Sequence, residues 1–123
     1  MKLYAIFLLV ILVVIGASKV VNMNSAAAEF VKATISSDTV VIFSKTYCPY
    51  CKMAKEVFNN LKHKYTLIEL DQREDGSEMQ DVLGELTGAR SVPRVFVKGK
   101  FVGGGTDVQA LYNNGELQQM LVA

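Results

Sequence analysis

The sequence predicts an α/β domain in which helices flank a central four-stranded mixed sheet, and two patterns lead to this fold class. An apolar run at residues 39–43, a helical pattern over 49–62 and a second run at 65–70 form a βαβ unit, whose strands should be parallel. Two short runs at residues 94–97 and 100–102 are separated by two residues that include a glycine, which predicts a hairpin. The hairpin adds an antiparallel edge to the sheet.

The other helices follow from apolar residues that recur at three- and four-residue steps. We expect them over residues 28–36, 79–86 and 108–121, the last with an interruption near 113–115. Gly88 should end the second of these helices, and Thr106 and Asp107 suit the N-cap of the third. The charged residues 71–77 are expected to form a solvated loop.

The amino-terminal segment differs in composition from the rest of the chain. Residues 3–17 form a nearly unbroken apolar run behind Met1-Lys2, which matches a secretory signal. A membrane-spanning helix needs roughly 20 apolar residues, and this run reaches that length only if it continues to Val21. A cleaved signal is therefore favoured over an anchor, and a buried first strand of the domain is a third alternative.

The predicted organisation is a signal peptide or membrane anchor at residues 1–25 and one compact domain at 26–123. Small residues suited to cleavage occur at 16–18 and at 25–28, and the sequence does not choose between them. We expect the domain in the secretory pathway, in the lumen of the ER or Golgi, or outside the cell. If the segment is retained, residues 3–21 would attach the protein to the membrane.

The charge balance argues against a nucleic-acid partner. The chain has 13 basic and 12 acidic side chains, so its formal net charge is +1. Binding to nucleic acid requires a concentrated basic surface. We therefore expect no nucleic-acid binding.

The segment Cys48-Pro49-Tyr50-Cys51 lies where the first strand ends and a helix begins. Cys48 would occupy the helix N-cap, where unpaired N–H groups and the positive end of the helix dipole favour a thiolate. Pro49 suits the first helical position, and Cys51 would lie one turn inside the helix. Cys48 is therefore the candidate nucleophile and Cys51 the candidate resolving thiol, with Lys45 as a nearby cation.

Two other interpretations of the cysteine pair are weaker. A structural zinc site needs about four ligands, whereas the chain offers two cysteines and His63, which lies between two lysines and is most simply a solvated residue. A purely structural disulfide would close a very short loop and would remove little entropy from the unfolded chain. We therefore expect redox chemistry and no metal.

Two further segments suggest a site for an extended peptide-like ligand. In a redox fold, Pro93 in the bend before the third strand would be cis, and Val92 could pair its backbone with such a ligand. The glycines at 103–105 allow close approach, and the helix start near Thr106 and Asp107 offers N–H groups to a carboxylate and a carboxylate to an amine. This combination suits a γ-glutamyl group. Ordinary turns, with a trans proline and an N-cap aspartate, are the alternative.

Taken in order, residues 48–51, 87–96 and 103–107 resemble the dithiol glutaredoxins, and the resemblance covers about residues 26–123. It implies a thioredoxin-like fold. Thioredoxin itself is less similar, because it has a Gly-Pro pair between its cysteines and a preceding Trp, and this chain contains no Trp.

The resemblance also implies a glutathione site. Lys45 and Gln80 would hold the glycine carboxylate, and Tyr50 would flank the tripeptide. Val92, followed by Pro93, would pair with the backbone of the cysteinyl residue.

The γ-glutamyl end of glutathione would bind to Gly105, Thr106 and Asp107 by the same resemblance. Two positions depart from the common pattern. Ser91 stands where many members have Thr, and Gly105 stands where some carry a further cysteine, so this chain has no third thiol.

The function implied is that of a monomeric, glutathione-dependent thiol-disulfide oxidoreductase. It would reduce protein–glutathione mixed disulfides and disulfide-bonded client proteins, with glutathione as co-substrate. Cys48 would attack and Cys51 would resolve, and in an oxidising compartment the direction could reverse. One alternative is a glutaredoxin that binds a [2Fe–2S] cluster through Cys48 and glutathione, against which the rigid Pro49 argues. A folding oxidase or isomerase is another, although this chain lacks the Gly-His pair of that family between its cysteines.

Overall fold

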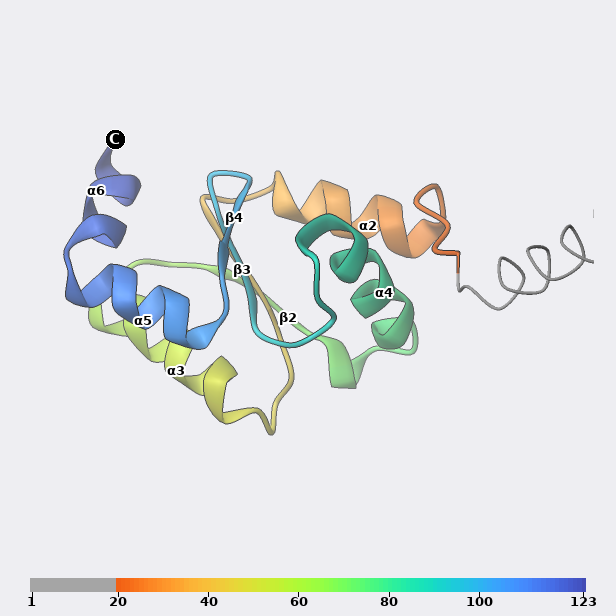
Figure 1. Cartoon of the computed structure of the whole chain (residues 1–123), viewed down its shortest axis with the longest axis horizontal. Helices are drawn as coiled ribbons and strands as arrows, with labels where there is room; N and C mark the ends of the chain where they lie inside the picture. Colours follow the sequence, from red (N-terminus) through yellow and green to blue (C-terminus); the bar gives the residue numbers. More distant parts are fainter. Residues whose placement is uncertain (1–19) are drawn as a thin grey trace, which may run out of the picture.

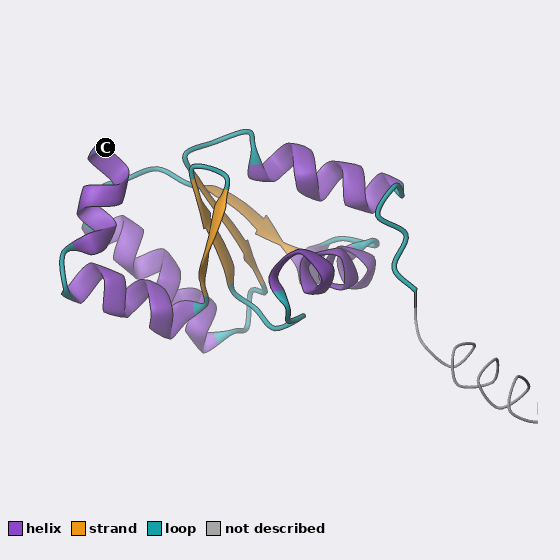
Figure 2. Cartoon of the chain, turned by 45° about the horizontal axis from the view of Figure 1, so that its top comes forward, coloured by secondary structure: helices purple, strands orange, loops and turns teal. Residues whose placement is uncertain are grey.

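The computed structural model of the protein describes residues 20–123 and contains a four-stranded sheet between two groups of helices (Figures 1 and 2). In chain order the elements are α2 (Ala26–Ile35), β1 (Val40–Ser44), α3 (Pro49–Asn60), β2 (Thr66–Glu69), the 3₁₀ helix η1 (Leu70–Gln72), α4 (Gly76–Thr87), β3 (Arg94–Val97), β4 (Lys100–Gly103), α5 (Gly105–Asn113) and α6 (Glu116–Val122).

The sheet confirms the mixed topology that the sequence predicts. Its strand order is β2-β1-β3-β4, with β1 parallel to β2 and antiparallel to β3, while β3 and β4 form the hairpin. The thioredoxin-like fold is thereby established. The predicted strands and helices lie within about three residues of those observed: α3 ends at Asn60 rather than at residue 62, and α4 and α5 begin at Gly76 and Gly105, three residues earlier than predicted.

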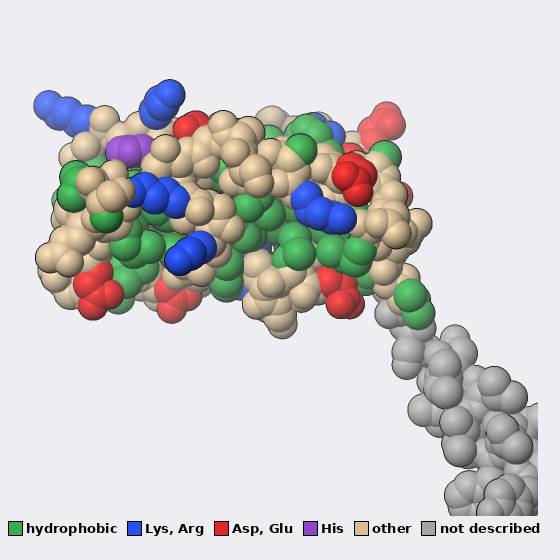
Figure 3. All heavy atoms as spheres, turned by 90° about the horizontal axis from the view of Figure 1, so that it is seen from above, with side chains coloured by type: hydrophobic (Ala, Val, Ile, Leu, Met, Phe, Trp, Pro, Cys, Tyr) green, Lys and Arg blue, Asp and Glu red, His purple; other side chains and the backbone are tan. Residues whose placement is uncertain are grey.

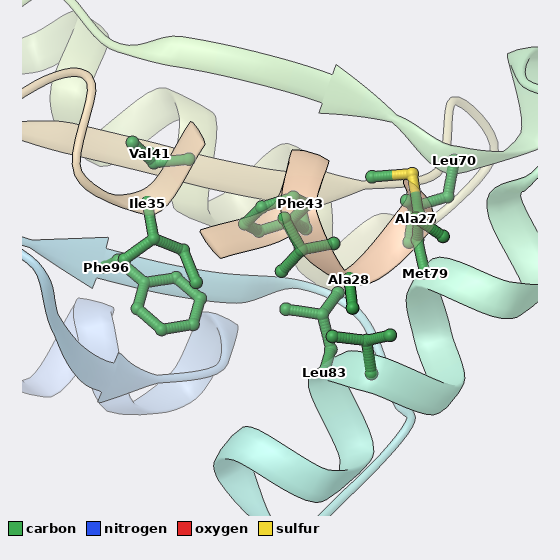
Figure 4. Packing of buried hydrophobic residues seen from close by; sticks show 11 residues of the cluster. Ala27, Ala28, Ile35, Val41, Phe43, Leu70, Met79, Leu83 and Phe96 are labelled. Carbon is green, nitrogen blue, oxygen red and sulfur yellow. The ribbon is translucent and has the colours of Figure 1, made fainter. Parts of the chain in front are cut away.

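The central strand β1 is buried on both faces, because its side chains alternate between two hydrophobic cores. Val41 and Phe43 point to the core that α2 and α4 cover. On the same side, the rings of Phe43 and Phe96 meet edge to face with their centroids 5.8 Å apart (Figure 4). Val40 and Ile42 point to the core that α3, α5 and α6 cover. This double burial fixes the direction in which β1 delivers the chain to the cysteine motif.

Two local expectations need correction. Helix α5 begins at Gly105 with Gly104 as its N-cap, so Thr106 and Asp107 lie inside the first turn rather than at the cap. The Asp107 carboxylate still caps the helix, because its Oδ2 accepts the Gly104 N–H at 2.9 Å. The exposed segment 71–77 is not simply solvated, since it contains part of η1 and the first turn of α4.

The residues just before α2 contact the folded domain. The side chains of Val21 and Met23 pack against the core under α2, and the Ser25 hydroxyl caps α2 by accepting the Ala28 N–H at 3.1 Å. The predicted signal or anchor lies mostly in residues 1–19, outside the described part of the chain. Within residues 20–123, no helix combines the length and the apolar character needed to cross a membrane. The boundary between residues 25 and 26 stays a prediction.

These contacts make the start of the domain testable. A chain shortened to residues 26–123 should be less stable than one that begins at Val20, because it lacks the Ser25 cap and two apolar contacts, worth about 2–3 kcal/mol together. Urea unfolding of both fragments measures the difference. A fragment that begins at Val21 is the control, since Val20 is 87% exposed. Equal stability of all three fragments would refute the role of residues 21–25.

Candidate active site

The sulfur of Cys48 caps helix α3. Cys48 has an extended backbone, and its Sγ accepts the N–H of Cys51 at 3.2 Å. Pro49 follows at the start of the helix, where a missing N–H has no cost. The Cys48 side chain is partly exposed. The predicted position of Cys48 is thus confirmed, and the sulfur faces the N-terminus of a helix, where negative charge is stabilised.

In contrast to the partly exposed Cys48, Cys51 has no exposed surface. Burial raises the pKa of the Cys51 thiol to about 11, and the interaction with Cys48 acts in the same direction. Hydrogen bonds from the Lys45 backbone and from the Ser44 side chain lower it in part. At neutral pH, Cys51 is therefore a neutral thiol one turn below a partly exposed sulfur. The motif contains two chemically unequal thiols.

The segment before β3 brings a backbone carbonyl to Cys48. The Val92–Pro93 peptide bond is cis, as expected, and the Cys48 Sγ–H donates to the Val92 carbonyl oxygen at 3.7 Å. Arg94 holds Ser91, the residue before Val92. Its Nε donates to the Ser91 carbonyl oxygen at 2.7 Å, and its guanidinium also donates to the Ser91 hydroxyl at 2.8 Å. No pattern in the sequence indicates this role of Arg94.

The start of α5 packs directly on the cysteine motif. A Cβ added at Gly105 would lie 2.6 Å from the Tyr50 carbonyl oxygen, so only glycine allows this approach. A Cβ at Gly104 would lie 3.6 Å from the Pro93 carbonyl oxygen, which is an ordinary contact. The three segments 48–51, 92–93 and 104–107 therefore converge. Thr106 and Asp107 are exposed at this junction, and Tyr50 is 55% exposed.

The two other predicted site residues contact segments that lead into this junction. Lys45 is partly buried in the loop that follows β1, and its carbonyl oxygen accepts the Cys48 N–H at 3.2 Å. Gln80, on α4, donates from Nε2 to the Arg90 carbonyl oxygen at 2.8 Å. Gln80 thus supports the loop that leads to Val92. The binding roles of these residues remain predictions.

Asp71 fixes the loop between β1 and Cys48, a role that the charged segment 71–77 did not indicate in the sequence. Its Oδ1 accepts the Thr46 N–H at 3.0 Å, and the Thr46 hydroxyl donates to Oδ2. These bonds, with a smaller contribution from the Lys45 charge, lower the pKa of the Asp71 carboxyl. The parallel register that pairs Ser44 with Glu69 brings the two loops together. That register was the one signal that could have revealed the contact.

The described residues contain no candidate metal site. Among residues 20–123, no group of three or more His, Cys, Asp or Glu side chains lies close enough to hold an ion. The Nδ1 of His63 lies 2.8 Å from the Lys64 carbonyl oxygen. Figure 3 shows the histidine on a face where acidic and basic side chains are interspersed.

Comparisons with known proteins point to one family. A sequence model of the glutaredoxin family matches residues 40–102. Glutaredoxin-C4 of Arabidopsis thaliana is 53% identical over 98 residues, which are 80% of this chain and 73% of that protein. Monothiol glutaredoxin-S6 of Oryza sativa subsp. japonica is 45% identical over 117 residues, 95% of this chain and 87% of that protein. The crystal structure of a buckwheat glutaredoxin–glutathione complex aligns with a TM-score of 0.76 at 42% identity, covering 78% of this chain and 87% of that one.

The contact between Gly105 and Tyr50 gives a stability prediction. Gly105→Ala should destabilise the protein by about 3 kcal/mol, the upper end of overpacking costs, because the obstructing atom belongs to the backbone. Gly104→Ala is the matched control and should cost about 1 kcal/mol or less, as an altered N-cap. Urea unfolding of both variants measures the loss of unfolding free energy in each. Equal losses would show that the close approach is not a constraint.

The raised pKa of Cys51 predicts a pH dependence of stability. The unfolded chain ionises this thiol near pH 9, whereas the folded chain does so only near pH 11. Unfolding therefore releases a proton in this window, and the stability of the reduced protein should fall as the pH rises from about 9 to 11. Cys51→Ser should lack this part of the fall. If the free energies of unfolding of wild type and Cys51→Ser change equally with pH across that range, the raised pKa of Cys51 would be contradicted.

Proposed function

This chain belongs to the glutaredoxin family, and we propose that it reduces protein–glutathione mixed disulfides and protein disulfides, with Cys48 as nucleophile and Cys51 as resolving thiol. As a glutaredoxin it is a thiol-disulfide oxidoreductase that depends on glutathione. The further proposal concerns which of the two sulfurs attacks the substrate and which resolves the mixed disulfide. It depends on one observation, the inequality of a partly exposed Cys48 and a fully buried Cys51.

For a mixed disulfide of a client with glutathione, one sulfur is sufficient. The Cys48 thiolate attacks the glutathione sulfur, the client leaves as a thiolate that takes up a proton, and Cys48 is joined to glutathione. The thiolate of a second glutathione then attacks this glutathione sulfur. Oxidised glutathione leaves and the Cys48 thiolate is restored. The contact of the Cys51 N–H with Sγ stabilises Cys48 whenever it departs as a thiolate.

For a disulfide within a client, the second sulfur is needed. Cys48 forms a mixed disulfide with one client sulfur and releases the other. Cys51 then attacks Cys48, which frees the client thiol and leaves a Cys48–Cys51 disulfide for glutathione to reduce. Relatives of similar identity include one named as a monothiol glutaredoxin. The proposal of a dithiol route therefore depends on the buried Cys51 of this chain.

The site proposed for glutathione is the junction around Cys48. Val92 would pair with the extended backbone of the tripeptide, and Lys45 and Gln80 would hold its glycine carboxylate. Thr106 and Asp107, at the exposed start of α5, would receive its γ-glutamyl end. The buckwheat relative that was crystallised with glutathione supports this proposal at 42% identity.

The location and the partners are also proposals. The charged start and the apolar run at residues 3–17 support entry into the secretory pathway or attachment to a membrane. Clients would be glutathionylated or disulfide-bonded proteins, and the enzyme would act as a monomer.

The competing function is binding of a [2Fe–2S] cluster through Cys48 and glutathione. Visible absorbance after anaerobic reconstitution would favour it, and colourless reconstituted protein would remove it.

Cysteine variants separate the two routes. With a small glutathione mixed disulfide as substrate, Cys48→Ser should fall to the uncatalysed rate, whereas Cys51→Ser should remain within about twofold of wild type, because only the first sulfur reacts. With a protein disulfide as substrate, both variants should be inactive. Glutathione-coupled turnover measures both reactions. Unchanged turnover of the mixed disulfide in Cys48→Ser would eliminate the proposal.

A further inference from the structure

The Arg94 side chain, at the start of β3, joins three segments of the fold, and the proposed function does not use it. Its guanidinium donates to the Ser91 carbonyl oxygen at 2.7 Å and to the Ser91 hydroxyl at 2.8 Å. It also donates to the hydroxyl of Thr87, the last residue of α4, at 3.4 Å. The guanidinium carbon lies 4.9 Å from the centroid of the Phe101 ring on β4.

These contacts place the Arg94 side chain on the face of the sheet opposite to the cysteine motif. Phe96, two residues further along β3, belongs to the core that α2 and α4 cover, and its ring centroid lies 5.6 Å from that of Phe101 (Figure 4). Because side chains alternate along a strand, Arg94 and Phe96 share this face. Helix α3, which Cys48 caps, covers the other core. Arg94 therefore acts on the site through the loop that it holds.

The loop carries this effect to the site through a single peptide unit. The Ser91 carbonyl and the Val92 N–H belong to the same planar trans peptide unit, so they point in opposite directions. Arg94 draws the carbonyl towards its own face of the sheet, and this turns the Val92 N–H away from that face. The Val92 side chain packs against the core under α2 and α4, whereas its carbonyl oxygen accepts the Cys48 Sγ–H at 3.7 Å.

The guanidinium is well suited to hold this peptide unit. Its planar fork reaches the carbonyl and the hydroxyl of Ser91 together, and hydrogen bonds from a charged donor are about twice as strong as neutral ones. Burial lowers the pKa of Arg94 and the charge of Asp107 opposes this shift, but the group stays protonated at neutral pH. A half-buried cation that lost its acceptors would be destabilised. The loop is therefore held before any ligand binds.

We propose that Arg94 is a positioning residue for glutathione, which fixes the Ser91–Val92 peptide unit so that the Val92 N–H is directed to the backbone of the tripeptide. This inference rests on the glutathione site proposed above and deepens it. A site that is held in its bound geometry saves the cost of ordering it. Arg94 should therefore matter for a disulfide that carries glutathione, and not for the attack of Cys48 on a disulfide without a peptide.

The test compares two disulfides that release the same coloured aromatic thiolate. One is the mixed disulfide of the aromatic thiol with glutathione, and the other is its symmetric disulfide. The reduced full chain is mixed with each at increasing concentration, and the first release of colour reports the attack by Cys48.

In Arg94→Met, the half-saturating concentration of the glutathione mixed disulfide should rise about tenfold, as expected when a hydrogen bond to a charged group is lost. Its limiting rate should stay within about twofold of wild type, because binding and not bond exchange is weakened. The rate with the symmetric disulfide should also stay within about twofold.

Two further variants serve as controls. Arg73 also stacks on a phenylalanine, 4.2 Å from the Phe30 centroid, and makes two guanidinium hydrogen bonds, both to Asp75. Arg73→Met should leave both reactions unchanged. Arg94→Lys retains the positive charge near Asp107 but not the fork, so the half-saturating concentration should rise about threefold. This variant also carries the test if Arg94→Met does not fold.

The alternative results are distinct from one another. A half-saturating concentration equal to that of wild type in Arg94→Met would refute the inference. An equal slowing with the two disulfides would show that Arg94 has only a structural role. Failure of the proposed glutathione site appears in wild type itself, which would then favour the glutathione mixed disulfide over the symmetric one no more than a small free thiol does.

Discussion

The hydrogen bond from the Cys51 N–H to the Cys48 sulfur is the contact on which the rest of the site depends. A reactive atom that serves as a helix cap is fixed by the helix itself, and α3 is fixed in turn by the doubly buried strand β1. Val92 and Gly105 then approach the motif from two other segments. Because the sulfur that begins the helix is also the proposed nucleophile, folding and the proposed reactivity share one geometric requirement.

The secondary structure could be predicted where a local pattern determines it. The βαβ unit and the hairpin follow from periodicity and a turn, and the helix position of Cys48 follows from its place after an apolar run. The start of α5 was placed too late, because a glycine N-cap leaves no side-chain signal and Asp107 caps from inside the helix. The apolar residues Val21 and Met23 belong to the core only through tertiary packing.

The polar contacts that support the site could not be predicted from sequence patterns. Thr46 and Asp71 are 25 residues apart, as are Ser44 and Glu69, and both pairs meet only because β1 and β2 pair in one particular parallel register. A shift of one residue would separate both pairs. These contacts show why the sequence indicated the positions of the two sulfurs but not the residues that hold the loop between β1 and Cys48 in place.

The burial of Cys51 has a consequence for oxidative damage. A partly exposed cysteine sulfur such as that of Cys48 is open to peroxides, which convert it to a sulfenic acid and then, irreversibly, to higher oxides. A neutral thiol held without exposed surface is shielded from the same reagents. It remains available to condense with the sulfenic acid of Cys48, giving water and a reducible disulfide. By the proposed dithiol route, the buried partner would thus convert an oxidised enzyme into a state that glutathione can restore.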